Sequence, residues 1–302
     1  MKTRLLPLLL ALSIGVLSAC GSDKPATPEQ QPVALSVDPP KVSLTSKGEG
    51  EAAVIAYKDA GANQESTVEF TDGFDQGTGE AGTLPEEAPQ NPHVDTLSAT
   101  LNASTTGSEK RDVAIKMSKA NHSNLAFASD VNSAEGFELG WTAQASGRSE
   151  TVKLKAPEKS SDQGRAIAEL YLMKLLAQPI IFPTDPVAPG ATWTVENRVA
   201  GDSTMLRSTT YTLVSHKGSI VELDATISER PAVTALTLDG EGGQGELKVI
   251  NSHSIGTGRF TIDLAKPIPT AGKFSLTTRV TYGQDNSTKR VFQDFNSGIT
   301  FK

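Results

Sequence analysis

The chain has 302 residues with 28 basic and 35 acidic side chains, and its formal net charge is −7. This acidic balance argues against nucleic acid or an anionic bilayer surface as an electrostatic partner. The single cysteine, Cys20, excludes an internal disulfide, but a chain of this length can bury a substantial core without one.

The first residues have the pattern of a secretory signal peptide. Lys2 and Arg4 precede an apolar stretch from Leu5 to Leu17, and small residues follow. The apolar stretch is shorter than the roughly 20 residues that a spanning helix needs, so it indicates a leader and not a membrane span.

Leu17-Ser18-Ala19-Cys20 ends this leader and resembles the lipobox of bacterial lipoproteins. The resemblance implies that residues 1–19 are a lipoprotein signal peptide, and that Cys20 becomes the diacylglycerol- and palmitate-bearing N-terminus. It places the chain on the extracytoplasmic face of the cell membrane, or on the outer membrane if the source is diderm. The alternatives are an ordinary signal peptide that leaves a free thiol nearby, and an uncleaved anchor.

Residues 20–33 follow as a lipid-attached flexible tether, because Gly21 to Pro32 is polar, rich in Pro and Gln, and has no apolar period. Removing Lys2 and Arg4 with the leader leaves 26 basic against 35 acidic residues, a net charge of −9. Residues 34–302 are expected to form a β-rich extracytoplasmic domain. Two halves split near residue 180 are the alternative.

The first half of this domain alternates apolar and polar residues, which is typical of half-buried antiparallel strands. We expect strands at 52–57, 67–70, 94–103, 112–117, 124–129, 137–143 and 151–155. The segment 72–92 is rich in Gly, Pro and acidic residues and predicts a long surface loop.

One helix is predicted over residues 162–178, with Ser160, Ser161 or Asp162 as its N-cap and Pro179 as its stop. Leu170 and Leu172 fall on opposite sides of this helix, and its few polar residues are scattered. A helix that is apolar nearly all round is buried on several sides, so we expect a core helix. A membrane-surface or partner-binding helix is the alternative, but it would carry a broad charged face.

Alternation returns in the second half, where strands are predicted at 192–200, 207–216, 219–228, 246–253, 258–264, 272–282 and 289–295. Gly256-Thr257-Gly258 and His216-Lys217-Gly218 are predicted hairpin connections, and 239–245 a flexible loop. The expected fold is mainly β (β-rich α+β): a curved antiparallel sheet or open barrel packed on one central helix.

The run from Pro186 to Trp193 and the run from Gly256 to Leu264 resemble a family of uncharacterised actinobacterial envelope lipoproteins, in which a Gly-x-x-Trp turn opens an antiparallel meander. The resemblance implies no activity, because that family has no established function. In physical terms, Gly190 permits a tight turn and Trp193 can anchor the next strand in the core.

No pattern of catalytic or metal-binding residues stands out. The histidines lack ligand spacing and are predicted to be surface or loop residues: His93, His122, His216 and His253. The serine-enzyme motifs Gly-x-Ser-x-Gly and Ser-x-x-Lys are absent, and there is no Walker A loop and no Gly-x-Gly-x-x-Gly that opens a predicted helix. The acidic residues of 72–92 and 239–245 do not follow the order of an EF-hand. We therefore predict no catalytic, metal or cofactor residues, and Cys20 as the one modified site.

The expected function is that of a non-enzymatic binding or envelope-interaction protein. Its partners would be the lipid bilayer, through acylated Cys20, and an envelope protein or a lipid ligand, but no nucleic acid. The alternative is a carrier of a lipid or other hydrophobic ligand in a cavity between sheet and helix. A hydrolase with an unrecognised site is the third hypothesis.

Overall fold

The computed structural model describes residues 33–36, 38–107, 109–199, 204–240 and 243–302, and Pro32–Lys302 form one compact unit. Its strands are β1 (Val33–Ser36), β2 (Lys41–Ser46), β3 (Asn63–Glu80), β4 (Asp95–Thr106), β5 (Arg111–His122), β6 (Glu138–Ala143), β7 (Ser149–Lys155), β8 (Thr192–Val199), β9 (Met205–Lys217), β10 (Ile220–Pro231), β11 (Ala235–Gly240), β12 (Gly243–Asp263), β13 (Ala271–Gly283) and β14 (Lys289–Phe301). Its helical elements are η1 (Leu125–Phe127), α1 (Ala128–Ser133), α2 (Asp162–Leu172) and α3 (Lys174–Ala177).

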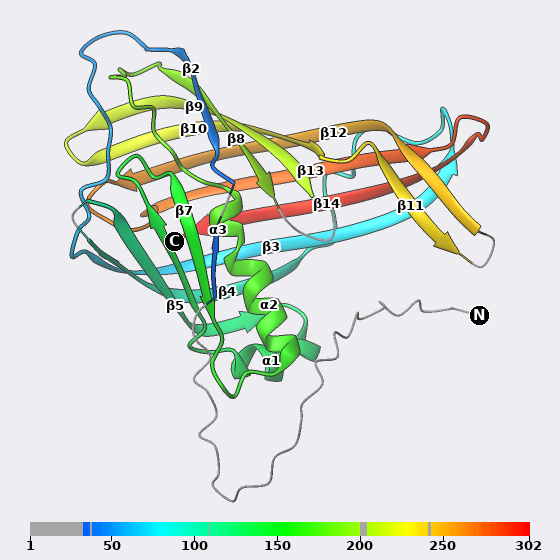
Figure 1. Cartoon of the computed structure of the whole chain (residues 1–302), viewed down its shortest axis with the longest axis horizontal. Coiled ribbons are helices and arrows are strands. Elements are labelled where there is room, and N and C mark those ends of the chain that lie inside the picture. The colour runs from blue at the N-terminus through cyan, green and yellow to red at the C-terminus, as the bar shows by residue number, and fades with distance from the viewer. Residues whose placement is uncertain (1–32, 37, 108, 200–203, 241–242) are drawn as a thin grey trace, which may run out of the picture. The chain divides into compact units, whose positions relative to one another are not determined.

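All fourteen strands belong to one antiparallel sheet in the order β1-β7-β6-β5-β4-β3-β14-β13-β12-β10-β9-β8-β2, and β11 pairs with β12 beside this path. The helices α2 and α3 cross one face of the sheet, called the inner face below (Figure 1). The expectation of a mainly β fold with one large, unclosed antiparallel sheet and few helices is confirmed.

The two edges of the sheet are connected by consecutive strands. β1 pairs with β7 at one edge, and β2 pairs with β8 at the other. The chain from Ser36 to Lys41 is five residue steps long and spans at most about 18 Å. The edges must therefore lie near each other, which requires the sheet to curve around whatever packs on its inner face.

The inner face packs on α2, α3 and the segment that follows them. Ser161 caps α2, its Oγ accepting a hydrogen bond from the backbone N–H of Gly164 at 3.0 Å. Gly164 lies against the carbonyl oxygen of Asp130, where a side chain would clash, so α1 and α2 pack closely. After α3, Gly190 has a φ of +83° and Trp193 is fully buried, its Nε1 donating to the carbonyl of Ile181 at 2.7 Å.

The predicted core helix is present in two parts, because α2 ends at Leu172 and α3 begins at Lys174. Its buried side carries Ile167, Ala168, Tyr171 and Leu172. The expectation that Leu170 is buried is wrong: it is 49% exposed. The sheet covers one side of the helix and leaves the side of Leu170 open, although that side is apolar too.

Two expectations in the first half are also wrong. The predicted loop at 72–92 begins with strand, because β3 continues to Glu80 in register with β14. The predicted strand at 52–57 is an extended segment with one β-bridge, between Ala53 and Val187. It is not a sheet strand, because its backbone N–H groups bond to separate segments: that of Tyr57 donates to the carbonyl of Ala145 and that of Lys58 to the carbonyl of Leu264.

The segment 124–129 and the glycines of the second half differ from the prediction as well. The side chain of Asn124 accepts from the N–H of Ala126 and starts η1, so this segment is helical and not a strand. Gly256 and Gly258 lie within the continuous strand β12 and not in a turn. A Cβ at Gly256 would meet the carbonyl oxygen of Ile227 at 2.6 Å, so glycine is required there by the close approach of β10.

The predicted flexible loop at 239–245 is instead largely strand. β11 runs to Gly240 and β12 starts at Gly243, and the two pair as a hairpin. The other predicted hairpin is confirmed, since Lys217 ends β9, Ile220 opens β10 and Gly218 between them has a φ of +62°.

The two sides of α2 predict opposite responses to truncation. Leu172→Ala should lower the free energy of unfolding by about 2–5 kcal/mol, because Leu172 is fully buried in the core. Leu170→Ala should change it by no more than about 0.5 kcal/mol. Urea unfolding of both variants checks this, and equal losses would contradict the assignment of the buried side.

Candidate binding surface

The inner face of the sheet carries two separate apolar clusters. The larger one lies under α2 and α3 and includes Phe70, Trp193 and Phe260. The second one lies farther along the strands, with Met205, Val280 and Tyr282 buried at its centre. Figure 1 shows β3, β14, β13 and β12 continuing past α2 and α3, so the second cluster belongs to a part of the sheet that these helices do not cover.

Four charged side chains lie between the two clusters. We call these side chains the polar belt: Asp72, Lys174, Arg207 and Glu229. The Nζ of Lys174 lies 2.5 Å from Oδ1 of Asp72. The Nε and Nη2 of Arg207 lie 2.8 and 2.7 Å from Oε2 of Glu229, and both side chains are almost fully buried.

The polar belt also supplies a hydrogen-bond donor to the C-terminal end of α3. The carbonyl oxygen of Ala177 accepts hydrogen bonds from Nη1 of Arg207 at 3.1 Å and from Nδ2 of Asn197 at 3.2 Å. A helix C-terminus leaves carbonyls without intrahelical partners, and a cation is favoured beside them. Arg207 thus joins α3 to the inner face while Glu229 balances its charge.

Lys174 is buried, and burial disfavours its charged form. Burial lowers the pKa of Lys174, and the charge of Asp72 and its hydrogen bond oppose this shift. The hydroxyl of Ser297 accepts a second hydrogen bond from Nζ at 3.1 Å. These contacts fix the side of α2 and α3 that carries Lys174 against β3 and β14.

Beyond the belt, apolar side chains are left open to solvent. Phe74 lies two residues after Asp72 on the same face of β3, is 54% exposed, and its ring centroid lies 5.4 Å from that of Phe295 on β14. Leu170 is 49% exposed near the end of α2, four residues before Lys174. Because Lys174 reaches Asp72, the end of α2 lies near the part of β3 that carries Phe74. We call Phe74, Phe295 and Leu170 the open apolar surface.

The space between the sheet and the helices is filled. The void left there has a volume of about 60 Å³ and is lined mainly by apolar side chains, among them Leu175, Phe260 and Phe274. Pockets that hold small molecules typically have roughly 300–1,000 Å³. This void is therefore too small to enclose an apolar ligand of that size.

Sequence reasoning missed the open apolar surface, because Phe74 was assigned to a loop and Leu170 to the core. A signal for Phe74 was present: the alternation of Val68 and Phe70 continues through Asp72 to Phe74 on one face of a strand. The one predicted site residue, Cys20, lies outside the described residues, as do the leader and the tether as far as Pro32.

The histidines do not gather into a site, and one of them, His253, lies near a carboxylate, with its Nε2 3.8 Å from Oε1 of Glu87. His122 was expected at the surface but is buried, with Nε2 3.2 Å from the hydroxyl of Tyr171 and Nδ1 accepting from the N–H of Asn124. These contacts give it a packing role. Among the described residues, no three His, Cys, Asp or Glu side chains form a group that could hold a metal ion.

Comparisons with known proteins give no relationship: no protein-family model matches the chain, and no curated protein matches its sequence. Within the described part of the chain, no helix combines the length and the apolar character that crossing a membrane requires.

The polar belt predicts a large effect of one truncation. Arg207→Ala should lower the free energy of unfolding by about 3–5 kcal/mol, because it leaves Glu229 buried without its cation and removes one of the two donors to the carbonyl of Ala177. Arg259→Ala is the control and should change stability little, because the pair of Arg259 with Asp224 is solvent-exposed. Equal effects of the two variants in urea unfolding would refute this role of the belt.

Proposed function

We propose that the chain is a lipid-anchored protein of the extracytoplasmic side of the membrane, and that its β domain binds an apolar segment of another envelope protein on the open apolar surface. The observation that carries the binding role is that Phe74 and Leu170, which lie on β3 and on the helix pair that the contact of Lys174 with Asp72 joins to β3, are both about half exposed. Exposed apolar patches on soluble domains often mark sites of interaction.

The anchor is argued from the sequence. A lipobox cysteine directly after an apolar leader supplies two or three acyl chains, whereas a single chain gives only marginal membrane binding. The polar segment from Gly21 to Pro32 would then separate the bilayer from a domain whose first strand begins at Val33. A tether of this length lets the domain reach a neighbouring membrane protein.

A polypeptide suits this surface better than an acyl chain. Gln293 lies two residues from Phe295 on the same face of β14, paired across the strands with Gln76 and Val280. Gln76 is exposed and lies two residues beyond Phe74 on the same face of β3. A protein segment can place polar groups against this amide together with apolar side chains against Phe74, but a hydrocarbon chain cannot.

The anchor predicts a specific dependence on Cys20. Cys20→Ala should abolish incorporation of a palmitate analogue and leave the leader uncleaved, because both acylation and cleavage would act at this residue. Metabolic labelling and intact-mass measurement check this. Undiminished label on the variant would exclude Cys20 as the anchor.

The binding surface predicts where a partner can be captured. A photo-crosslinking residue at Phe74 or Leu170, introduced in cells, should give an adduct with the mass of a second protein. The control is Val214 on β9, which is 40% exposed on the face of the sheet opposite to α2 and should give no such adduct. A lipid adduct at Phe74 would instead favour the hydrophobic-ligand carrier, and equal protein adducts at all three positions would contradict a specific surface.

A further inference from the structure

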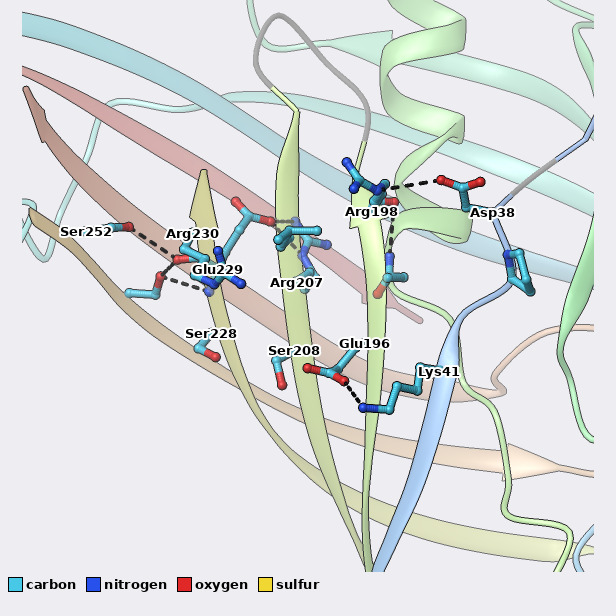
Figure 2. A pocket seen from close by; sticks show the side chains of 14 residues that line it. Asp38, Lys41, Glu196, Arg198, Arg207, Ser208, Ser228, Glu229, Arg230 and Ser252 are labelled. Carbon is cyan, nitrogen blue, oxygen red and sulfur yellow. Dashed lines mark hydrogen bonds and ion pairs between the residues drawn. The ribbon is translucent and has the colours of Figure 1, made fainter. Parts of the chain in front are cut away.

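A separate groove lies on the outer face of the sheet, the face opposite to α2. It crosses β2, β8, β9, β10 and β12 and has a volume of about 510 Å³, within the range of small-molecule sites. Figure 2 shows its side chains, which include several cations and hydroxyls. We call it the outer groove.

Two arginines and two serines form adjacent rows in this groove. Arg198 on β8 and Arg230 on β10 both pair with Leu206 on β9, so they lie on the same face with one strand between them. Two residues along the strands, Ser208 and Ser228 are paired in the next row. Strand spacing puts the two arginine Cα atoms about 10 Å apart, and the rows about 7 Å apart.

These four side chains retain donors for a ligand. Arg230, Ser208 and Ser228 make no side-chain hydrogen bond or ion pair with any described residue, and Arg198 has only a loose contact of 3.6 Å with Asp38. The other acidic side chain facing the groove is Glu196, which pairs with Lys41 at 3.3 Å. The groove therefore presents a surplus of positive charge on a chain whose net charge is −7.

The floor of the groove is held in place from the inner side. The Arg207–Glu229 pair lies in the strands directly beneath it, and Oγ of Ser254 bridges to the backbone of Glu229, accepting from its N–H at 3.0 Å and donating to its carbonyl at 2.6 Å. This bridge continues the connection of β10 to β12 where their ladder ends at Ile227 and Gly256. Arg230 is the residue after Glu229, so its backbone position is fixed.

We propose that the outer groove binds a phosphate group, with Arg198 and Arg230 on either side of it and the hydroxyls of Ser208 and Ser228 as further donors. A guanidinium donates two parallel hydrogen bonds to phosphate or carboxylate oxygens. One arginine satisfies a carboxylate, whereas two arginines and two hydroxyls match the larger number of oxygens of a phosphate. The volume exceeds one phosphate, so the ligand carries it on a larger polar group, as a phosphorylated polyol or a phospholipid headgroup does. This site does not depend on the open apolar surface.

Isothermal titration calorimetry of the full chain in detergent tests the site with three probes: inorganic phosphate, glycerol 3-phosphate and dihexanoylphosphatidylglycerol. We expect at least one probe to bind, and the double variant Arg198→Gln with Arg230→Gln to weaken that binding at least 10-fold, about 1.4 kcal/mol. Preference for glycerol 3-phosphate would indicate a soluble phosphorylated ligand, and preference for the lipid a headgroup. Affinity should also fall as salt is added.

Arg259→Gln is the matched control, because Arg259 is an exposed arginine on the same face but is held by Asp224 through two hydrogen bonds. It should leave binding unchanged. Both groove arginines are exposed, so thermal unfolding should show the double variant folded like the parent chain. Absence of binding by all three probes at millimolar concentration, or undiminished binding by the double variant, would overturn the proposal.

Discussion

Fifteen helical residues, in α2 and α3, pack on a sheet of fourteen strands. This difference in size determines which parts of the inner face are buried and which are exposed. A helix is about 10 Å wide and covers only three or four residues of each strand it crosses, whereas β13 and β14 are 13 residues long. The remaining length of the inner face must be covered by other segments or left open. The extended chain at Tyr57 covers part of it beside α3, where Tyr57 and Leu176 line the same small void. The polar belt contacts α3 through Lys174 and Ala177.

The polar belt allows a filled core and an open apolar surface to share one face of a sheet. Arg207 binds Glu229 and the last carbonyl of α3, and Lys174 binds Asp72, so the helix is fixed at its C-terminal end by charge as well as by packing. Buried ion pairs are costly to break even where they add little net stability. Phe74 and Phe295, directly beyond the belt, are thereby separated from the larger cluster, and Phe74 stays exposed. The outer groove uses the reverse side of the same strands, so one set of buried contacts supports both proposed surfaces.

The candidate surfaces could be predicted only in part. Alternation identified a strand at Val68 and Phe70 and continues to Phe74, but the glycines and acidic residues of 71–80 favoured a loop. The pairing with β14 decides this, because β14 supplies hydrogen bonds along the whole length. Arg198 and Arg230 are 32 positions apart in the chain, and no local spacing connects them. They meet because β8 and β10 both pair with β9 in a register that brings each opposite Leu206.

The sequence by itself determined the β-rich class and the position of the helix, narrowed its N-cap to Ser160, Ser161 or Asp162, and predicted the lipid anchor at Cys20, because periodicity, capping and leader signals are local properties of the chain. The structure then identifies Ser161 as the N-cap. Tertiary structure alone decided which side of the helix is buried. Leu170 and Leu172 are chemically equal, and α2 could bury either side, but the curvature imposed by the tied edges of the sheet and the contacts of Lys174 and Arg207 allow one orientation. Long-range pairing likewise decided that Gly256 belongs to a strand. The reason for a glycine there is the close approach of Ile227 on β10, which leaves no space for a side chain.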